Sequence, residues 1–180
     1  MKLNLGCSDA RRDGYINVDI SLEPGVDVVA DLDHHWPWKE DSVDEIIAFD
    51  IIEHLHDKIQ TMNQIWRVLR PGGQVYIIVP TTNGMGAWQD PTHVSFWNKN
   101  SFLYYELGSA YNTRFAKSYG IKALFKVIHY GLEETFDGEK LHILLEAVKP
   151  NSHQAYNEEV QRYKETVQVS KVDIFPGRTK

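Results

Sequence analysis

Carboxylates and imidazoles placed beside short apolar segments are the side chains in this sequence best suited to chemistry. Asp19 and Asp31 each lie at the end of an apolar segment. A carboxylate only accepts hydrogen bonds, so each can receive them from the hydroxyl or amino groups of a ligand. His93 lies three residues after Asp90 in a loop rich in aromatic residues. A neutral imidazole suits general-base catalysis near pH 7, so this pair is the candidate for proton transfer.

The start of the chain must position the first of these acids. A short apolar segment, residues 3–5, stops at Gly6, and the next segment, residues 15–20, carries Asp19 near its end. Strand, glycine turn, second strand and terminal carboxylate form the usual nucleotide pocket of an open α/β sheet. Small residues in the turn let the backbone approach the ligand, and the acid accepts from ribose hydroxyls.

At these residues the chain resembles the class I S-adenosylmethionine-dependent methyltransferases, in particular a small branch of type 11. That branch opens with Leu-Asn-Leu-Gly-Cys-Gly and continues with Gly-Tyr-x-Asn-Val-Asp, and residues 3–7 and 14–19 here match these motifs. Ser8 stands where the family usually has its next glycine, and Asn4 where the wider superfamily often has an acid. The resemblance covers about residues 3–150.

The resemblance implies S-adenosylmethionine as cofactor and S-adenosylhomocysteine as product. It implies that Asp31 meets the adenine amino group and that the backbone amide of Leu32 meets the ring; the alternative is an aspartate that closes a turn. Residues 49–55 resemble the end of the family's fourth strand, beside the methionine part of the cofactor, where His54 supports the strand end or lies near the methyl donor. The expected cofactor contacts are Leu5, Gly6, Cys7, Ser8, Asp19, Ile20, Asp31, Leu32, Phe49, Asp50 and His54.

The loop 80–102 is the expected acceptor side. Methyl transfer from a sulfonium is an in-line displacement, so the protein mainly supplies alignment and a dry pocket. A hydroxyl acceptor also benefits from a base, for which His93 is the catalytic candidate and Asp90 its orienting partner. The aromatic residues around them predict a substrate lid. The alternative is that these aromatic residues only close the edge of the domain.

The first crossover is too short for an ordinary helix. Residues 6–14 separate the first two predicted strands, whereas a strand–helix–strand crossover needs about 10–12 residues or more. We therefore expect a single turn or a loop in place of the first helix. Arg11 and Arg12 could supply a ligand carboxylate with the positive charge that this helix would provide, or they are solvated loop residues.

The rest of the chain predicts a Rossmann-like, doubly wound, mostly parallel α/β sheet with an antiparallel C-terminal edge strand. Asp57 and Gln60 predict a capping box for a helix that ends at residues 71–73, and residues 101–107 should be helical. The predicted strands are 26–32, 45–49, 74–79, 124–130 and 140–148, the last two joined by a turn at 136–138. We expect one methyltransferase domain, 1–150, then an amphipathic helix within 151–180 and a tail at 176–180.

Composition sets the class of protein and its surroundings. The 180 residues suit one domain, and the net charge of -6 argues against a long contact with nucleic-acid phosphates. Cys7 is the single cysteine, so no internal disulfide can form, which fits a reducing compartment. Without a signal peptide or an apolar segment of membrane-spanning length, we expect a cytoplasmic protein with no membrane contact.

Several chemistries lack their motifs. The Asp-Pro-Pro-Tyr-like tetrapeptide of amino-methylating nucleic-acid enzymes, the Pro-Cys pair of cytosine-C5 enzymes and G-x-G-x-x-G of nicotinamide enzymes are all missing. We expect no metal, because the histidines at 34, 35, 54 and 56 lack cysteine partners and the i, i+4 spacing of helical ligands.

The leading hypothesis is O- or N-methylation of a small molecule, such as a sugar, a glycan precursor or a secondary metabolite. Two alternatives stay open: an inactive cofactor-binding protein, favoured by Ser8, Asn4 and the short crossover, and a subunit that activates a partner methyltransferase. We also expect a homo-oligomer, in the simplest case a homodimer, unless the C-terminal segment supplies the cover over the site that helices before the first strand would give.

Overall fold

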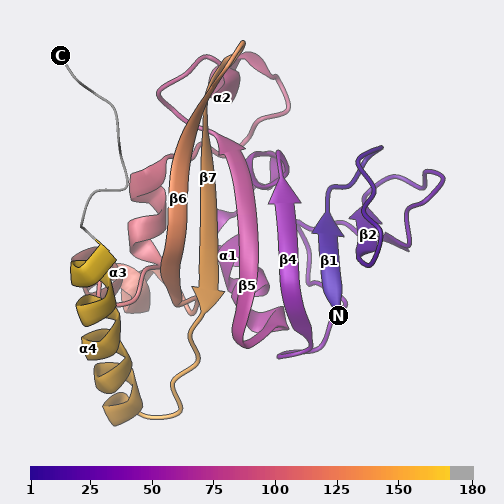
Figure 1. Ribbon diagram of the computed structural model, residues 1–180. Helices are drawn as coiled ribbons and strands as arrows, with labels where there is room; N and C mark the ends of the chain where they lie inside the picture. The colour runs from indigo at the N-terminus through magenta and orange to yellow at the C-terminus, as the bar shows by residue number, and fades with distance from the viewer. Residues whose placement is uncertain (171–180) are drawn as a thin grey trace. The chain divides into compact units, whose positions relative to one another are not determined.

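The computed structural model describes residues 1–170 and divides the chain into a first unit, Met1–Val148, and a second that starts at Lys149 (Figure 1). The second unit contains helix α4 (His153–Ser170), where the sequence predicts a helix. The predicted tail, 176–180, lies outside the described residues. Within the described part of the chain, no helix is both long enough and apolar enough to cross a membrane.

Seven strands of the described residues form one sheet in the order β3-β2-β1-β4-β5-β7-β6. Neighbouring strands from β3 to β5 pair in parallel, whereas β7 runs antiparallel to both β5 and β6. The strands are β1 (Lys2–Leu5), β2 (Ile16–Asp19), β3 (Val28–Val29), β4 (Val43–Phe49), β5 (Leu69–Pro80), β6 (Phe125–Thr135) and β7 (Gly138–Ala147). The predicted mixed α/β sheet, with its antiparallel hairpin at the C-terminal edge, is confirmed.

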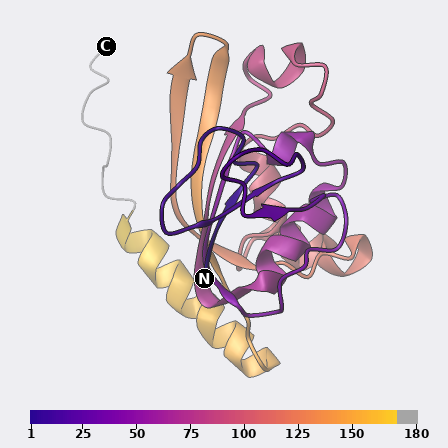
Figure 2. The same cartoon turned by 90° about the vertical axis from the view of Figure 1, so that its right-hand side faces the viewer.

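The helices of the first unit connect these strands. They are η1 (Ile52–His54), α1 (Lys58–Val68), α2 (Gly86–Gln89), η2 (Lys99–Tyr104) and α3 (Ala110–Tyr119). Helices α1 and α3 lie on the same face of the sheet (Figures 1 and 2). Along β5, Val75, Ile77 and Val79 are buried and alternate with half-buried neighbours, as expected for a strand packed on one face.

Residues 6–15 contain no helix, which confirms the prediction for the first crossover. Asn4 holds this loop in place of a helix. Its Nδ2 donates to the Ala10 carbonyl and to Asn17 Oδ1, each at 2.9 Å, and Asn17 Oδ1 also accepts from the Arg12 amide. A carboxylate at position 4 could not donate either bond. The Asn4 side-chain amide, where the wider superfamily often has an acid, therefore holds the helix-free loop against β1 and β2.

Element boundaries differ from the predictions where backbone pairing overrides local signals. Helix α1 ends at Val68, before the Pro-Gly-Gly segment, because the chain enters β5 at Leu69 and pairs there with Val43. Asp57 caps α1, but the predicted capping box is wrong, since the Gln60 side chain donates to the Asp33 carbonyl instead.

Three further elements differ from the sequence prediction. The segment expected to be helical at 101–107 is the 3-10 helix η2, which starts earlier and is capped by Asn98. The third predicted strand shortens to the two residues of β3. Helices α2 and α3 were not predicted.

Candidate functional site

The carboxyl ends of β1, β2, β4 and β5 meet at one edge of the sheet, the upper edge in Figure 1. Chain order reverses between β1 and β4, the point where open α/β sheets bind ligands. Gly6 follows β1, Asp19 ends β2, and Asp50 follows β4. Fold topology thus places the predicted glycine turn and two of the predicted acids at a single edge.

The turn after β1 has positive φ at two positions, Gly6 and Ser8. Gly6 has a φ of 61°, and a Cβ there would lie 2.7 Å from the Ile51 side chain, so only glycine fits. Ser8 has a φ of 41° and its amide donates to Asp19 Oδ2 at 2.9 Å. Leu5 and Cys7 are buried, and burial raises the pKa of the Cys7 thiol. These two residues therefore offer a ligand their backbone and not their side chains.

Asp19 is held rigidly where the sequence places the ribose acceptor. Its second oxygen, Oδ1, accepts from the Ser21 amide at 3.0 Å, so a backbone amide fixes each carboxylate oxygen. Each oxygen keeps a further lone pair for a ligand hydroxyl. The neighbouring Ile20 side chain is 66% exposed, so it is free to cover a bound ring.

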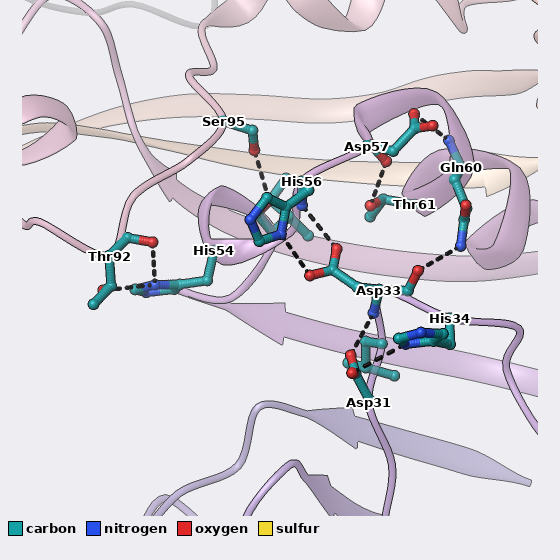
Figure 3. Close-up of polar contacts among 12 residues, drawn as sticks. Asp31, Asp33, His34, His54, His56, Asp57, Gln60, Thr61, Thr92 and Ser95 are labelled. Atoms are coloured by element: carbon teal, nitrogen blue, oxygen red, sulfur yellow. Dashed lines mark hydrogen bonds and ion pairs between the residues drawn. The ribbon is translucent and has the colours of Figure 1, made fainter.

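Asp31 lies in a polar turn after β3. Its Oδ1 accepts from the Asp33 amide at 3.0 Å, and its Oδ2 pairs with His34 Nδ1 at 3.0 Å (Figure 3). Asp33 reaches across to His56, which donates to it from both the amide and Nδ1. Asp31 therefore does close a turn, as the alternative interpretation expected. Its carboxylate also remains exposed, beside the buried Leu32.

Phe49 and Asp50 mark the other side of the edge. The Phe49 ring packs edge-on against Tyr76, with centroids 5.2 Å apart, and the Arg12 guanidinium lies 5.7 Å from the Phe49 ring. Asp50 has a φ of 50° and pairs with Lys140 at 2.7 Å. Arg12 is thus the loop arginine that lies beside Phe49, where the sequence expects the methionine part of the cofactor.

The segment 92–95 is fastened to η1. The amides of Val94 and Ser95 donate to the Glu53 carbonyl at 3.0 and 2.9 Å, and Ser95 Oγ donates to the Ile52 carbonyl at 2.9 Å. His54 Nδ1 contacts the Thr92 carbonyl at 3.3 Å and Thr92 Oγ1 at 3.1 Å (Figure 3). These bonds join two segments that are distant in the sequence.

The hydrogen bonds between η1 and the segment 92–95 bring two histidines, His54 and His93, together. The rings of His54 and His93 are in edge contact, with centroids 4.8 Å apart. His93 Nδ1 lies 3.2 Å from the Ala87 carbonyl, whereas Asp90 Oδ1 accepts from the Thr92 amide and hydroxyl. The prediction that Asp90 orients His93 is therefore corrected: Ala87 orients His93, and Asp90 holds the threonine that contacts His54. A backbone carbonyl can take this role because, like a carboxylate, it can accept a hydrogen bond from Nδ1.

Glu53 is the residue that sequence reasoning missed. Its side chain is 2% exposed, and neither carboxylate oxygen has a hydrogen-bond partner among the described residues. Burial raises the pKa of Glu53 to about 8. The signal was its position immediately before His54, in the segment that follows the fourth strand. A buried carboxylate without a partner is rare and calls for an explanation.

The aromatic residues of the loop divide into two sets. Trp97 is buried and its indole donates to Ser95 Oγ, so this residue belongs to the core. Trp88, which is 58% exposed, stacks on Phe96 with centroids 4.3 Å apart. The lid prediction therefore rests on the Trp88–Phe96 pair.

Two open cavities flank the start of α1. One, of about 570 Å³, is lined by Lys58 and aromatic residues such as Trp97 and Tyr104. The other, of about 540 Å³, includes His35, Gln64 and Arg67. Neither is lined by the glycine turn or Asp19. The candidate site is therefore the carboxyl edge of the sheet and not these cavities.

Comparison with known proteins finds similarity to methyltransferases. Residues 9–77 match the methyltransferase domain family. A probable S-adenosylmethionine-dependent methyltransferase of Mycolicibacterium smegmatis is 43% identical over 44 residues, which are 24% of this chain and 17% of that protein. The chain thus spans only a small part of the length of this curated relative.

Two solved structures share the fold. A putative methyltransferase of Haloferax volcanii, in complex with the Trm112 activator, is 18% identical, with a TM-score of 0.57 over 82% of each chain. The 1,6-didemethyltoxoflavin-N1-methyltransferase of Burkholderia thailandensis, bound to its substrate and S-adenosylhomocysteine, is 13% identical, with a TM-score of 0.55 over 82% of this chain and 71% of that one. At such identities the similarity establishes the fold alone.

Proposed function

Because this chain belongs to the class I S-adenosylmethionine-dependent methyltransferases of type 11, we propose that it transfers a methyl group from that cofactor to an oxygen or nitrogen of a small molecule. The cofactor, when bound, supplies a methyl group on a sulfonium. The residues of this chain then have to bind it, align the acceptor and exclude water.

The observation that carries this proposal is the rigid Asp19 carboxylate at the switch point of the sheet. Backbone amides of Ser8 and Ser21 fix both of its oxygens, and their remaining lone pairs suit the two hydroxyls of a ribose. Asp31 and the Leu32 amide would hold the adenine, and Arg12 beside Phe49 would meet the methionine carboxylate. The chain therefore has a residue of suitable chemistry for each part of the cofactor.

The acceptor side of the proposal lies at η1 and the segment 92–95. His93 and His54 lie next to the end of β4, and the exposed Trp88–Phe96 pair offers an apolar cover. In this proposal His93 accepts the proton of an acceptor hydroxyl, with its ring oriented by the Ala87 carbonyl.

Solved structures of this fold include methyltransferases for a toxoflavin precursor and for 16S rRNA, so the fold does not indicate the class of acceptor. The proposal of a small-molecule acceptor therefore rests on the properties of this chain. The net charge of -6 disfavours a long contact with RNA phosphates. A sugar, a glycan precursor or a secondary metabolite needs no such contact and is the acceptor class that we propose.

Calorimetric titration with S-adenosylmethionine and S-adenosylhomocysteine tests the cofactor site. Asp19→Asn keeps the shape of the side chain but loses charge and acceptor capacity, so we expect affinity for both ligands to fall at least tenfold. Asp13→Asn, at an exposed loop position, is the matched control and should bind like the unmodified chain. Equal affinity in Asp19→Asn, or no binding to the unmodified chain at millimolar ligand, would contradict the proposal.

Turnover separates an enzyme from the alternative, an inactive cofactor-binding or partner-activating subunit. We expect the unmodified chain to methylate a member of a panel of sugars, nucleotide sugars and phenolic metabolites, and His93→Ala to lose turnover while it keeps cofactor affinity. Cofactor binding with no turnover on this panel or on RNA would favour the inactive subunit.

A further inference from the structure

Three potential metal ligands converge beside the proposed acceptor site. One ligand atom from each of Glu53, His54 and His93 lies within 4.8 Å of the other two. Glu53 and His54 come from η1, and His93 comes from the segment that hydrogen bonds to η1 through the Glu53 carbonyl. The cluster therefore depends on backbone pairing between two segments and not on one flexible loop.

Both histidines are oriented as metal ligands usually are. The Ala87 carbonyl can only accept, so the Nδ1 of His93 carries the proton and donates to it. The Thr92 carbonyl fixes His54 in the same way, and Thr92 Oγ1 is free to accept from His54 because its own proton goes to Asp90. Each ring thus keeps its Nε2 lone pair for a ligand. Histidines that bind metals almost always donate their other N–H to a protein oxygen in this manner.

Glu53 supplies the second, independent observation. Glu53 is only 2% exposed to solvent, and both of its carboxylate oxygens lack a hydrogen-bond partner in the described part of the chain. A carboxylate buried in this way is unfavourable unless a cation or donors compensate it. When Glu53 is ionised, it and the two imidazole lone pairs are all acceptors, so among the described residues the cluster brings together three acceptors, an arrangement that a cation would stabilise.

We propose that Glu53, His54 and His93 bind a divalent transition-metal ion. Two imidazole nitrogens and one carboxylate oxygen favour ions such as Zn²⁺ or Mn²⁺ over Mg²⁺ and Ca²⁺, which prefer oxygen ligands only. A set of three protein ligands leaves coordination positions open. This proposal replaces the expectation of no metal, which considered spacing along the chain and so missed a site built from two distant segments.

The proposal also changes how the acceptor is activated, and this part rests on the proposed function. With a cation in the cluster, His93 is a ligand and not the proton acceptor. The cation lowers the pKa of a hydroxyl that coordinates to it, which favours an oxygen acceptor over a nitrogen acceptor.

Calorimetric titration of the full chain tests the metal site. The protein is prepared without a polyhistidine tag, stripped with a chelator and titrated with ZnCl₂ and separately with MgCl₂. We expect one Zn²⁺ per chain with at least tenfold preference over Mg²⁺, and at least a tenfold loss of Zn²⁺ affinity in Glu53→Gln and in His93→Ala. His142→Ala is the matched control, because His142 also pairs with a carboxylate, Glu133, but lies outside the cluster. It should bind like the unmodified chain.

Three results would overturn the metal proposal: no Zn²⁺ binding, equal binding in Glu53→Gln, or a loss as large in His142→Ala. Circular dichroism first confirms that each variant is folded; if Glu53→Gln is not, His93→Ala and the visible spectrum of the Co²⁺ form decide. S-adenosylhomocysteine titrated into the stripped protein keeps the two proposals separate. Cofactor binding without Zn²⁺ binding would reject the metal site alone, and Zn²⁺ binding without cofactor binding would reject the proposed function alone.

Discussion

At the scale of single residues, the edge of the sheet contains side chains and backbone angles that cost stability. Ser8 and Asp50 are two of the three non-glycine residues with positive φ in the part of the chain that the structure describes, and Glu53 is buried there without a hydrogen-bond partner. Such positions concentrate at functional sites, because the surrounding structure must compensate for them. Their clustering at the ends of β1 and β4 agrees with the location of the site.

The glycine turn gives a prediction at this scale. Gly6→Ala should lower the free energy of unfolding by roughly 2–4 kcal/mol, because the new methyl group adds a clash with Ile51 to the conformational cost of positive φ. Gly14→Ala is a matched control, since Gly14 has a φ of 81° but nothing lies within 4 Å of its added Cβ. We expect it to cost only about 1 kcal/mol.

Urea unfolding of both variants measures this difference. Equal losses for Gly6→Ala and Gly14→Ala would show that backbone conformation alone, and not the packing of Ile51 over the turn, requires glycine at position 6. Cofactor titration of the same variants then tells whether the turn also shapes the ligand site, in which case only Gly6→Ala weakens binding.

At the scale of elements, a hydrogen-bond network replaces a missing helix. The loop between β1 and β2 lacks a helix to hold it, and Asn4 ties it to Ala10 and Asn17. The same principle applies at η1, where backbone amides of the segment 92–95 position His93. Short polar contacts thus fix both parts of the site.

Substitution of the buried amide tests this account. Asn4→Asp should lower the free energy of unfolding by about 1–3 kcal/mol, because a carboxylate cannot donate and would face acceptor oxygens. Asn100→Asp, at an exposed position, should change it by less than about 0.5 kcal/mol. Thermal and urea unfolding measure both. An Asn4→Asp variant as stable as the unmodified chain would mean that the Asn4 side-chain bonds do not hold the loop.

At the scale of the whole molecule, the helices that cover the sheet determine which surface is left for a partner. Helices α1 and α3 of the first unit lie on one face, and the first crossover adds no helix. Apolar residues of β6 such as Ile128 and Leu132 are exposed, and a second copy that covered them would remove them from water.

We therefore predict a homodimer, to be measured by size-exclusion chromatography with light scattering at micromolar protein. The expected mass is that of two chains. A mass of one chain across a hundredfold range of concentration would reject the dimer and leave the C-terminal segment as the candidate cover.

The sequence by itself determined the elements whose signals are local. Alternating and continuous apolar segments predicted the strands, Gly6 predicted the turn after β1, and acids at strand ends predicted where ligand acceptors lie. These signals suffice because the carboxyl ends of parallel strands always meet at one edge. The length of the first crossover, residues 6–14, was likewise enough to predict that it contains no ordinary helix.

Only the tertiary structure decided which distant residues meet. The cluster of Glu53, His54 and His93 exists because amides of the segment 92–95 pair with the Glu53 carbonyl, a contact with no sequence periodicity. The same holds for Asn4, whose amide group is explained by partners in the loop and in β2. Burial and hydrogen-bond partners depend on contacts between segments, so local patterns could not predict that the Glu53 carboxylate has no hydrogen-bond partner within residues 1–170.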